Sequence, residues 1–278
     1  MARGLGHVQG RLAVVTGAAS GIGRATAREL ARRGAELALC DVDAERLERV
    51  AHELMARGAL VTFRTTDVTR VDEVERFAAL TLAERRAPDL LVNAAGVLVL
   101  GSFAQTTPDD WDHVIGVNLK GPVHVCRAFL PAMIARGTGG AVVNVASASA
   151  FATQSEIAAY GTTKHALFGL TQALADELGR HGISVSAVCP GFVDTPILER
   201  ARVRGDDPEA SRRAAANLLR RRRLSPERVA ERIVRAAERG IAVVPVGLEA
   251  RALWLLSRFA PGRVPLLFGA LRRLGSRT

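Results

Sequence analysis

Tyrosine, lysine and cysteine are scarce in this chain of 278 residues. It contains one tyrosine, Tyr160, and two lysines, Lys120 and Lys164, so nearly all of its 38 basic residues are arginine. The three cysteines lie far apart, which argues against a disulfide framework or a zinc site, and the six histidines are scattered. We therefore expect no metal site and a reducing, cytoplasmic environment.

Long apolar runs are also absent. No stretch approaches the ~18 residues that a membrane-spanning helix requires. The N-terminal region has only a short apolar run before a glycine-rich turn, so it does not predict a secretory signal. Hydrophobic residues make up 48% and charged residues 24%, as in a globular protein long enough for one large domain.

The net charge of +10 is unevenly distributed. Residues 199–278 contain 19 arginines and 8 acidic residues, which leaves residues 1–198 nearly neutral. Residues 248–278 mix arginine with leucine and aromatic residues and predict a basic, amphipathic C-terminal extension. Such a segment can contact a partner subunit, cover a substrate site or lie peripherally on a membrane. Its interleaved apolar residues argue against nucleic-acid binding.

Short apolar runs alternate with segments of helical periodicity as far as residue 247. Each run lacks polar alternation, as strands buried on both faces of a parallel sheet do. We therefore predict an α/β fold, a single doubly wound domain over 1–247 whose seven-stranded parallel sheet has helices on both faces. Residues 194–224 interrupt the pattern and are either a substrate lid or a solvated, arginine-bearing helix. The expected strands are 12–17, 37–41, 60–67, 90–96, 141–147, 183–191 and 241–247.

A glycine-rich turn joins the first expected strand to the first helix. Glycines there allow close approach of a pyrophosphate, and the helix N-terminus attracts its charge. Asp41 ends the second strand, where a carboxylate binds ribose hydroxyls and repels a 2′-phosphate. This favours NAD over NADP, although Asp41 could instead cap the next helix, and Arg24 and Arg64 are distant candidates for a phosphate. The residues of the turn are Gly17, Ser20, Gly21, Ile22 and Gly23.

The single tyrosine precedes one of the two lysines by four residues. On a helix, Tyr160 and Lys164 share a face. An ammonium near a phenol lowers the phenol's pKa, and such a tyrosine can exchange a proton with an alcohol or ketone oxygen.

Together these motifs resemble the short-chain dehydrogenase/reductase family, over roughly residues 8–247. The segments that carry the resemblance are TGAASGIG (16–23), Asp67-Val68, NAAG (93–96), Asn118, Ser147, YGTTK (160–164) and PGFVDTP (190–196). The resemblance implies a Rossmann-like NAD-binding fold and an oxidoreductase that transfers a hydride. Two positions depart from the family's usual residues: Ala94 and Cys189 each stand where asparagine is frequent.

The resemblance also implies roles for individual residues. Tyr160 would transfer the proton, Ser147 would hold the substrate oxygen, with Ser149 as a competing hydroxyl, and Asn118 would hold a water. Lys164 would bind the nicotinamide ribose. The remaining cofactor-binding positions would be Asp67 and Val68 at the adenine, Asn93, Ala94 and Gly96 in the adjoining wall, and Pro190, Gly191, Val193 and Thr195 at the nicotinamide. A homodimer or homotetramer would form on the helices around 109–136 and 157–181.

The segments expected to line the substrate site are apolar and contain no arginine: 97–103, 149–158 and 191–199. An anionic substrate would require a cationic clamp. We therefore predict a hydrophobic secondary alcohol or ketone of steroid, terpenoid or acyl type. An NADP-dependent ketoreductase, a non-catalytic dinucleotide-binding regulator and a membrane or nucleic-acid scaffold are the alternatives. Enoyl reduction is disfavoured, because relatives of that kind have a wider Tyr–Lys spacing.

Overall fold

The sheet predicted from the sequence is present. The computed structural model describes residues 2–222 and 224–263, and within them seven parallel strands lie in the order β3-β2-β1-β4-β6-β7-β9. The prediction of a doubly wound parallel sheet is confirmed, because the strand order reverses between β1 and β4. The strands are β1 (Leu12–Thr16), β2 (Glu36–Asp41), β3 (Val61–Thr65), β4 (Leu90–Asn93), β6 (Gly140–Val145), β7 (Ile183–Pro190) and β9 (Val243–Val246).

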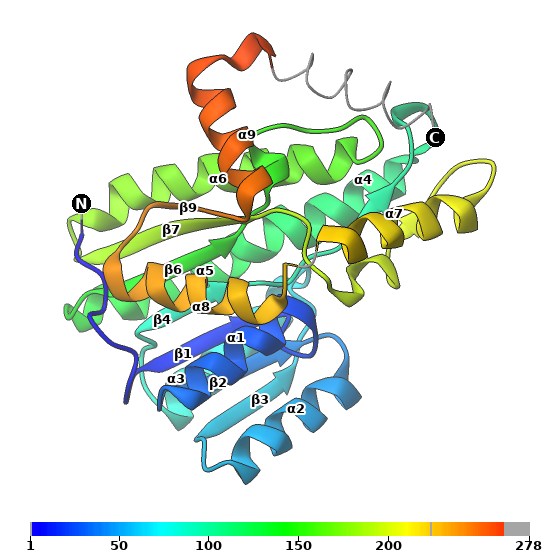
Figure 1. The fold of residues 1–278 in the computed structure, drawn as a ribbon. Coiled ribbons are helices and arrows are strands. Elements are labelled where there is room, and N and C mark those ends of the chain that lie inside the picture. Colours follow the sequence, from blue (N-terminus) through cyan, green and yellow to red (C-terminus); the bar gives the residue numbers. More distant parts are fainter. Residues whose placement is uncertain (1, 223, 264–278) are drawn as a thin grey trace.

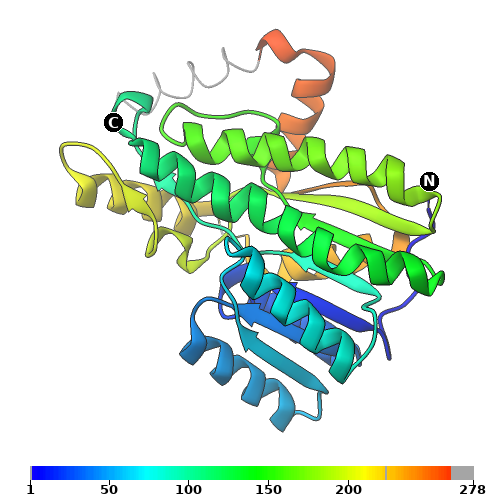
Figure 2. The ribbon, with the colours of Figure 1, turned by 180° about the vertical axis from the view of Figure 1, so that it is seen from behind.

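Helices cover both faces of the sheet (Figures 1 and 2). One face carries α1 (Gly21–Arg32), α2 (Ala44–Ala56) and α8 (Pro226–Arg239). The other carries α3 (Val71–Glu84), α5 (Gly121–Arg136) and α6 (Ala158–Gly179). Three further helices lie toward the carboxyl edge of the sheet or beyond it: α4 (Pro108–Ile115), α7 (Pro208–Arg222) and α9 (Leu248–Phe259).

Burial on both faces explains the continuous apolar runs. In β2, Leu37 and Leu39 contribute to the core under α1, α2 and α8, whereas Ala38 and Cys40 face the opposite core. Successive side chains of a strand point to opposite faces, so both sets must be apolar. All three cysteines are buried and unbridged.

A second, two-stranded sheet joins parts of the chain that are distant in sequence. β5 (Val99–Leu100) pairs with β8 (Arg202–Val203) in parallel. The sequence did not predict these strands, since each has only two residues. Their pairing ties the 194–224 segment, which also contains α7, to the loop after β4. No helix within the described residues is long and apolar enough to cross a membrane.

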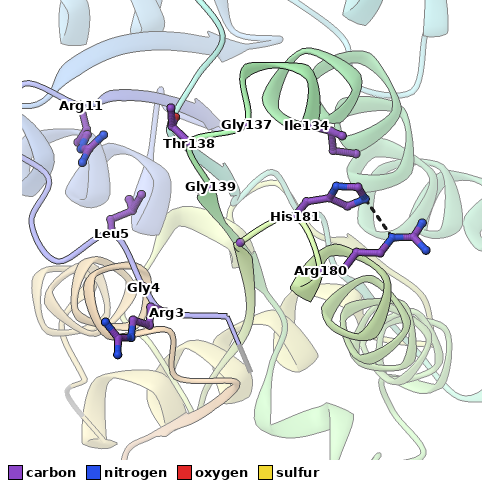
Figure 3. A pocket seen from close by; sticks show the side chains of 12 residues that line it. Arg3, Gly4, Leu5, Arg11, Ile134, Gly137, Thr138, Gly139, Arg180 and His181 are labelled. Carbon is purple, nitrogen blue, oxygen red and sulfur yellow. Dashed lines mark hydrogen bonds between the residues drawn. The ribbon is translucent and has the colours of Figure 1, made fainter.

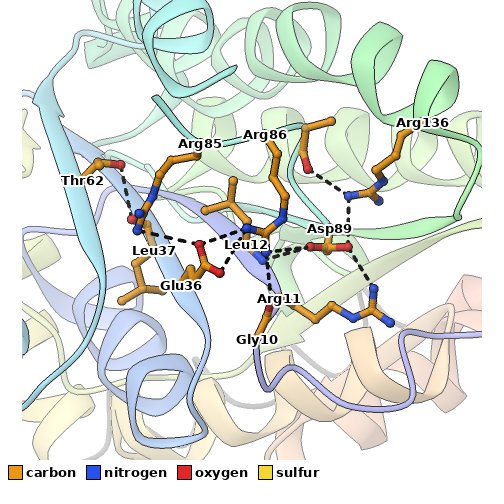
Figure 4. Close-up of polar contacts among 11 residues, drawn as sticks. Gly10, Arg11, Leu12, Glu36, Leu37, Thr62, Arg85, Arg86, Asp89 and Arg136 are labelled. Carbon is orange, nitrogen blue, oxygen red and sulfur yellow. Dashed lines mark hydrogen bonds and ion pairs between the residues drawn. The ribbon is translucent and has the colours of Figure 1, made fainter. Parts of the chain in front are cut away.

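The amino edge of the sheet is held by a buried carboxylate (Figure 4). Asp89, just before β4, accepts a hydrogen bond of 2.9 Å from the backbone N–H of Leu12 in β1. Its oxygens also lie 3.1 Å from Arg11, 3.0 Å from Arg136 and 3.7 Å from Arg86. The starts of β1 and β4 and the end of α5 are thereby joined through one side chain.

We expect Asp89→Asn to lower the free energy of unfolding by about 2–4 kcal/mol, because it leaves several arginines beside an uncharged group. Asp72→Asn is the matched control, because Asp72 is largely exposed and its ion pairs have little effect, so less than about 1 kcal/mol should be lost. Urea denaturation measures both. Equal losses in the two variants would contradict the role given to Asp89.

Candidate active site

The turn between β1 and α1 has no room for side chains. Gly17 (φ +66°) and Gly21 (φ +51°) adopt the left-handed conformation that favours glycine. A Cβ on Gly23 would lie 2.1 Å from the carbonyl oxygen of Gly17. Ser20 is the N-cap residue and makes no side-chain capping bond, while Ile22 packs against the core. The first turn of α1, with its partial positive charge, therefore starts at the carboxyl edge, where a phosphate fits.

The carboxylate of Asp41 lies beside this turn and is almost fully buried. It accepts hydrogen bonds from the backbone N–H groups of Ala19 (2.9 Å) and Asp43 (3.0 Å). Asp43, not Asp41, caps α2, since its side chain accepts from the N–H of Arg46. The capping alternative for Asp41 is thus wrong, and its carboxylate is fixed between the glycine turn and the β2–α2 loop.

The two distant arginines are directed toward other carboxylates. Arg24 lies 3.8 Å from Glu53 on α2, and Arg64 lies 2.5 Å from Glu84 on α3. Arg64 is therefore paired with a carboxylate, whereas Arg24 shares Glu53 with Arg28 and Arg57.

The residues predicted to face adenine follow β3. The side chain of Asp67 accepts from the N–H (2.9 Å) and hydroxyl (2.8 Å) of Thr69, forming a local turn. Val68 is buried, and a Cβ on Gly121 would lie 2.8 Å from its side chain. His124 contacts the carbonyl oxygen of Val68 at 2.9 Å. This loop is therefore fixed against the start of α5.

A chain of buried polar side chains joins the ends of β1, β4 and β6 to α6. Asn93 donates to Asn144 (2.8 Å), which donates to Thr171 (2.9 Å) on α6. The hydroxyl of Thr16 accepts from the N–H groups of Ala94 and Ala95, each at 3.1 Å. The side chain of Asn93 therefore points into the protein, where it joins strands. Neither Thr16 nor Asn144 was predicted; the available signal was a polar residue at the end of an apolar run.

The groups expected to carry the chemistry converge at the same edge. Tyr160 and Lys164 lie one turn apart on α6, with the ammonium nitrogen 5.6 Å from the centre of the phenol ring. Lys164 donates to the carbonyl oxygen of Val145 at the end of β6 (2.9 Å), and Ser147 hydrogen-bonds Tyr160. Gly96 is adjacent, since a Cβ there would lie 3.7 Å from the Lys164 nitrogen. Of the two competing hydroxyls, Ser147 is the one at the phenol.

Asn118 approaches the same point from a π-helical turn, Gly116–Lys120. Its side chain is fully buried, accepts from the N–H of Val97 (2.9 Å) and donates to the carbonyl of the same residue (3.0 Å). It also donates to the hydroxyl of Thr163 (3.2 Å) on α6. Asn118 thus fixes the loop after β4 to the helix that carries Tyr160.

Burial shifts the pKa values of Tyr160 and Lys164. Removal from water raises the pKa of Tyr160, and the hydrogen bond with Ser147 opposes that effect. Burial likewise lowers the pKa of Lys164 to about 8, while the nearby thiol of Cys189 has its pKa raised to about 12. The i, i+4 spacing predicted that Lys164 lowers the pKa of Tyr160. The direction of that prediction is wrong, because removal from water dominates at the phenol and raises its pKa.

The loop after β7 crosses the glycine turn. The N–H of Gly191 donates to the carbonyl of Val246 in β9 (2.9 Å), and Val193 is buried and pairs with Leu224. A Cβ on Gly21 would lie 3.3 Å from the methyl group of Thr195. Pro190, the last residue of β7, thus leads a loop that returns to the N-terminus of α1.

Segment 194–224 is fastened to α4 and to the β2–α2 loop by ion pairs. Arg204 binds Asp110 of α4 through two hydrogen bonds of 2.8 Å, and Arg202 lies 3.4 Å from the same carboxylate. This holds the pKa of Asp110 well below its usual range. On the other side, Arg200 lies 2.6 Å from Asp43 in the β2–α2 loop.

A hollow of about 810 Å³ lies at the amino edge of the sheet, opposite the carboxyl edge described above (Figure 3). It is open and lined by the N-terminal segment and by the loops before β6 and β7, including Arg3, Thr138 and His181. None of the residues predicted for the chemistry lines it. We therefore place the candidate site at the carboxyl edge.

Known proteins are similar to this chain in sequence and fold. A family model described as short chain dehydrogenase matches residues 11–204. Probable oxidoreductase EphD of Mycobacterium tuberculosis is 38% identical over 92% of this chain, but the match spans only 44% of EphD. A 1-deoxy-11-beta-hydroxypentalenate dehydrogenase of Streptomyces exfoliatus is 40% identical over 77% of this chain and 79% of its own.

A solved short chain dehydrogenase/reductase from Burkholderia phymatum, in complex with NAD, superimposes with a TM-score of 0.82. It is 32% identical to this chain, and the alignment covers 94% of this chain and 96% of the other. The similarity therefore extends over nearly all of both chains.

The buried ammonium predicts a pH-dependent cost in stability. Below the folded-state pKa of about 8, Lys164 is charged in both folded and unfolded chains, and its burial destabilises the fold. We expect Lys164→Met to raise the free energy of unfolding at pH 7 by about 1–3 kcal/mol. The difference in unfolding free energy between Lys164→Met and the wild type should narrow as pH rises from about 8 toward 10.5, where the wild-type lysine also becomes neutral.

Urea denaturation at pH 7 and pH 9.5 measures this gap. Lys120→Met is the matched control, because Lys120 is exposed and should show no such pH-dependent gap. A gap that stays constant between the two pH values would show that the ammonium is not buried at a cost.

Proposed function

The chain belongs to the short-chain dehydrogenase family, and on that premise we propose that it is an NAD(H)-dependent oxidoreductase acting on a hydrophobic secondary alcohol or ketone. The observation that carries the proposal is the convergence of Tyr160, Lys164 and Ser147 at the edge that also holds the glycine turn. An NADP-dependent ketoreductase and a non-catalytic regulator are the alternatives.

The residues at the carboxyl edge fit a dinucleotide. The N-terminus of α1, which follows the glycine turn, would offer its N–H groups and partial positive charge to a pyrophosphate, and Asp41 presents a buried carboxylate where a ribose would lie. A carboxylate there disfavours the 2′-phosphate of NADP, and Arg64, one of the two arginines that could oppose this, is paired with Glu84. The relative crystallised with NAD supports the same choice.

Four side chains would take part in the transfer of the proton. A bound nicotinamide would supply or accept the hydride at carbon. The phenol of Tyr160, whose pKa is raised, stays protonated at neutral pH and can donate to a ketone oxygen. Ser147 would hold that oxygen by its hydroxyl, and Lys164 would bind the ribose hydroxyls and help to transfer the proton. Asn118 would hold the loops around the phenol and a water on the path to solvent.

An apolar substrate is supported by the charges near the cleft. Arg202 of β8 and Arg204 just after it are both directed at the carboxylate of Asp110, not at the proposed substrate site. The relative from Streptomyces exfoliatus is, by its name, a dehydrogenase of a hydroxypentalenate. We propose a steroid-, terpenoid- or acyl-like substrate, covered by segment 194–224 acting as a lid.

The assembly of the chain and the role of its C-terminal extension are also proposals. The family resemblance favours a homodimer or homotetramer in the cytoplasm, built on the helices around 109–136 and 157–181. The extension 248–278 would add a peripheral membrane contact, and α9 exposes Leu248, Leu255 and Phe259. Residues 264–278 of that extension lie outside the described residues. No cluster of three metal-binding side chains occurs in the part of the chain that the structure describes.

The cofactor choice predicts a clear difference in affinity. NADH should bind at least about tenfold more tightly than NADPH, because Asp41 repels the extra phosphate. Asp41→Asn should narrow that ratio, whereas Asp72→Asn, on an exposed site, should leave it unchanged. Fluorescence titration with both cofactors measures it. Tighter binding of NADPH to the wild type would refute the role given to Asp41.

Removal of the phenol hydroxyl should separate binding from chemistry. Tyr160→Phe should bind NADH normally and lose at least about a hundredfold in kcat, because it removes the proton donor. The test is oxidation or reduction of a panel of hydrophobic secondary alcohols and ketones. Turnover at the wild-type rate would exclude Tyr160 as the proton donor.

A further inference from the structure

The start of α9 contacts the loop that follows β7. The carboxylate of Glu249, in the first turn of α9, accepts a hydrogen bond from the backbone N–H of Phe192 at 3.3 Å. A Cβ on Gly191 would lie 2.5 Å from the same carboxylate oxygen. Residue 191 is therefore a position where the absence of a side chain lets an acidic group approach the backbone.

The position of Glu249 is fixed by the elements on either side of it. β9 pairs with β7, and Pro190 lies opposite Val246 at the end of the ladder. The chain then turns at Gly247, whose φ of +101° favours glycine, directly into α9. Because strand and turn are both constrained, the first turn of the helix begins at a defined place beside the loop.

The next turn of α9 is buried against the active-site strand ends. Leu253 and Trp254 pack against a buried cluster that includes Ala146 and Phe151, on either side of Ser147, and Cys189 at the end of β7. Ala250 is fully buried. The helix thus contacts both the strand end that carries Ser147 and the strand that leads to Gly191 (Figure 1).

We propose that Glu249 is a positioning residue for the nicotinamide half of the cofactor. The inference rests on the proposed function, in which the backbone near Val193 and the hydroxyl of Thr195 hold the nicotinamide amide. A charged acceptor holds an N–H more firmly than a neutral one. By fixing residue 192, Glu249 sets the path of the backbone that reaches the nicotinamide. The adenosine half binds at Asp41 and Asp67, which Glu249 does not touch.

Because Glu249 acts on the nicotinamide half only, a change there should affect ligands that contain nicotinamide and spare those that do not. Glu249→Ala should weaken binding of NADH and of NAD⁺ about five- to tenfold, as loss of a hydrogen bond to a charged group implies. Binding of ADP-ribose, which lacks nicotinamide, should change by less than about twofold. Glu249→Gln keeps an oxygen that can accept from the Phe192 N–H, so it should recover most of the affinity for NADH. Isothermal titration calorimetry measures all three ligands.

A matched control is available in α8. Glu227 also lies in the first turn of its helix and is exposed, so Glu227→Ala reports the general effect of removing such a carboxylate. It should bind NADH and ADP-ribose as the wild type does. Urea denaturation of Glu249→Ala establishes that the variant is folded under the titration conditions.

Two results would overturn the inference alone: unchanged affinity of Glu249→Ala for NADH, or equal weakening of NADH and ADP-ribose. The first would show that the contact does not act on the cofactor, and the second that the change damages the whole site. Failure of the wild type to bind either ligand would overturn the proposed cofactor and this inference together. Recovery of NADH binding in Glu249→Gln supports positioning by the hydrogen bond.

Discussion

The close approach of backbone segments around Gly17 is the constraint on which the carboxyl edge depends. A Cβ there would lie 2.7 Å from the Cα of Ala95, and one on Gly23 would lie 2.1 Å from the Gly17 oxygen. Thr16 uses its hydroxyl to hold the Ala94–Ala95 backbone against the same turn. The end of β1, the start of α1 and the loop after β4 are therefore fixed relative to each other. The positions of Asp41 and Asn118 follow from that contact.

This arrangement costs stability at the candidate active site. A lysine and a tyrosine lie close together in surroundings that disfavour charge on either, so the lysine's pKa falls to about 8 and the tyrosine's rises. The carbonyl of Val145 and the hydroxyl of Ser147 partly compensate by hydrogen bonding. Sites prepared for chemistry commonly sacrifice stability in this way. The buried carboxylate of Asp89, which binds several arginines, lies at the amino edge, at the other end of the strands from this site.

The sequence predicted all seven strands of the large sheet, but it predicted the details of the candidate site only in part. Strands buried on both faces appear in the sequence as continuous apolar runs, so all seven could be located from the order of these runs along the chain. The β5–β8 pair could not, because two-residue strands about a hundred residues apart have no periodicity. The direction of the pKa shift at Tyr160 was missed, since depth of burial is not encoded in the Tyr–Lys spacing. Glu249 was overlooked for a related reason: its partner is a backbone N–H, which every residue but proline has.

Segment 194–224 is joined to the rest of the molecule by the β5–β8 pair and by ion pairs. Arg204 and Arg202 meet the fully buried carboxylate of Asp110 on one flank, whereas the Arg200–Asp43 pair on the other flank lies near the surface. Ion pairs of this exposure weaken as dissolved salt screens them. Dissolved salt should therefore loosen the attachment of the segment at Asp43 more than its attachment at the buried carboxylate of Asp110.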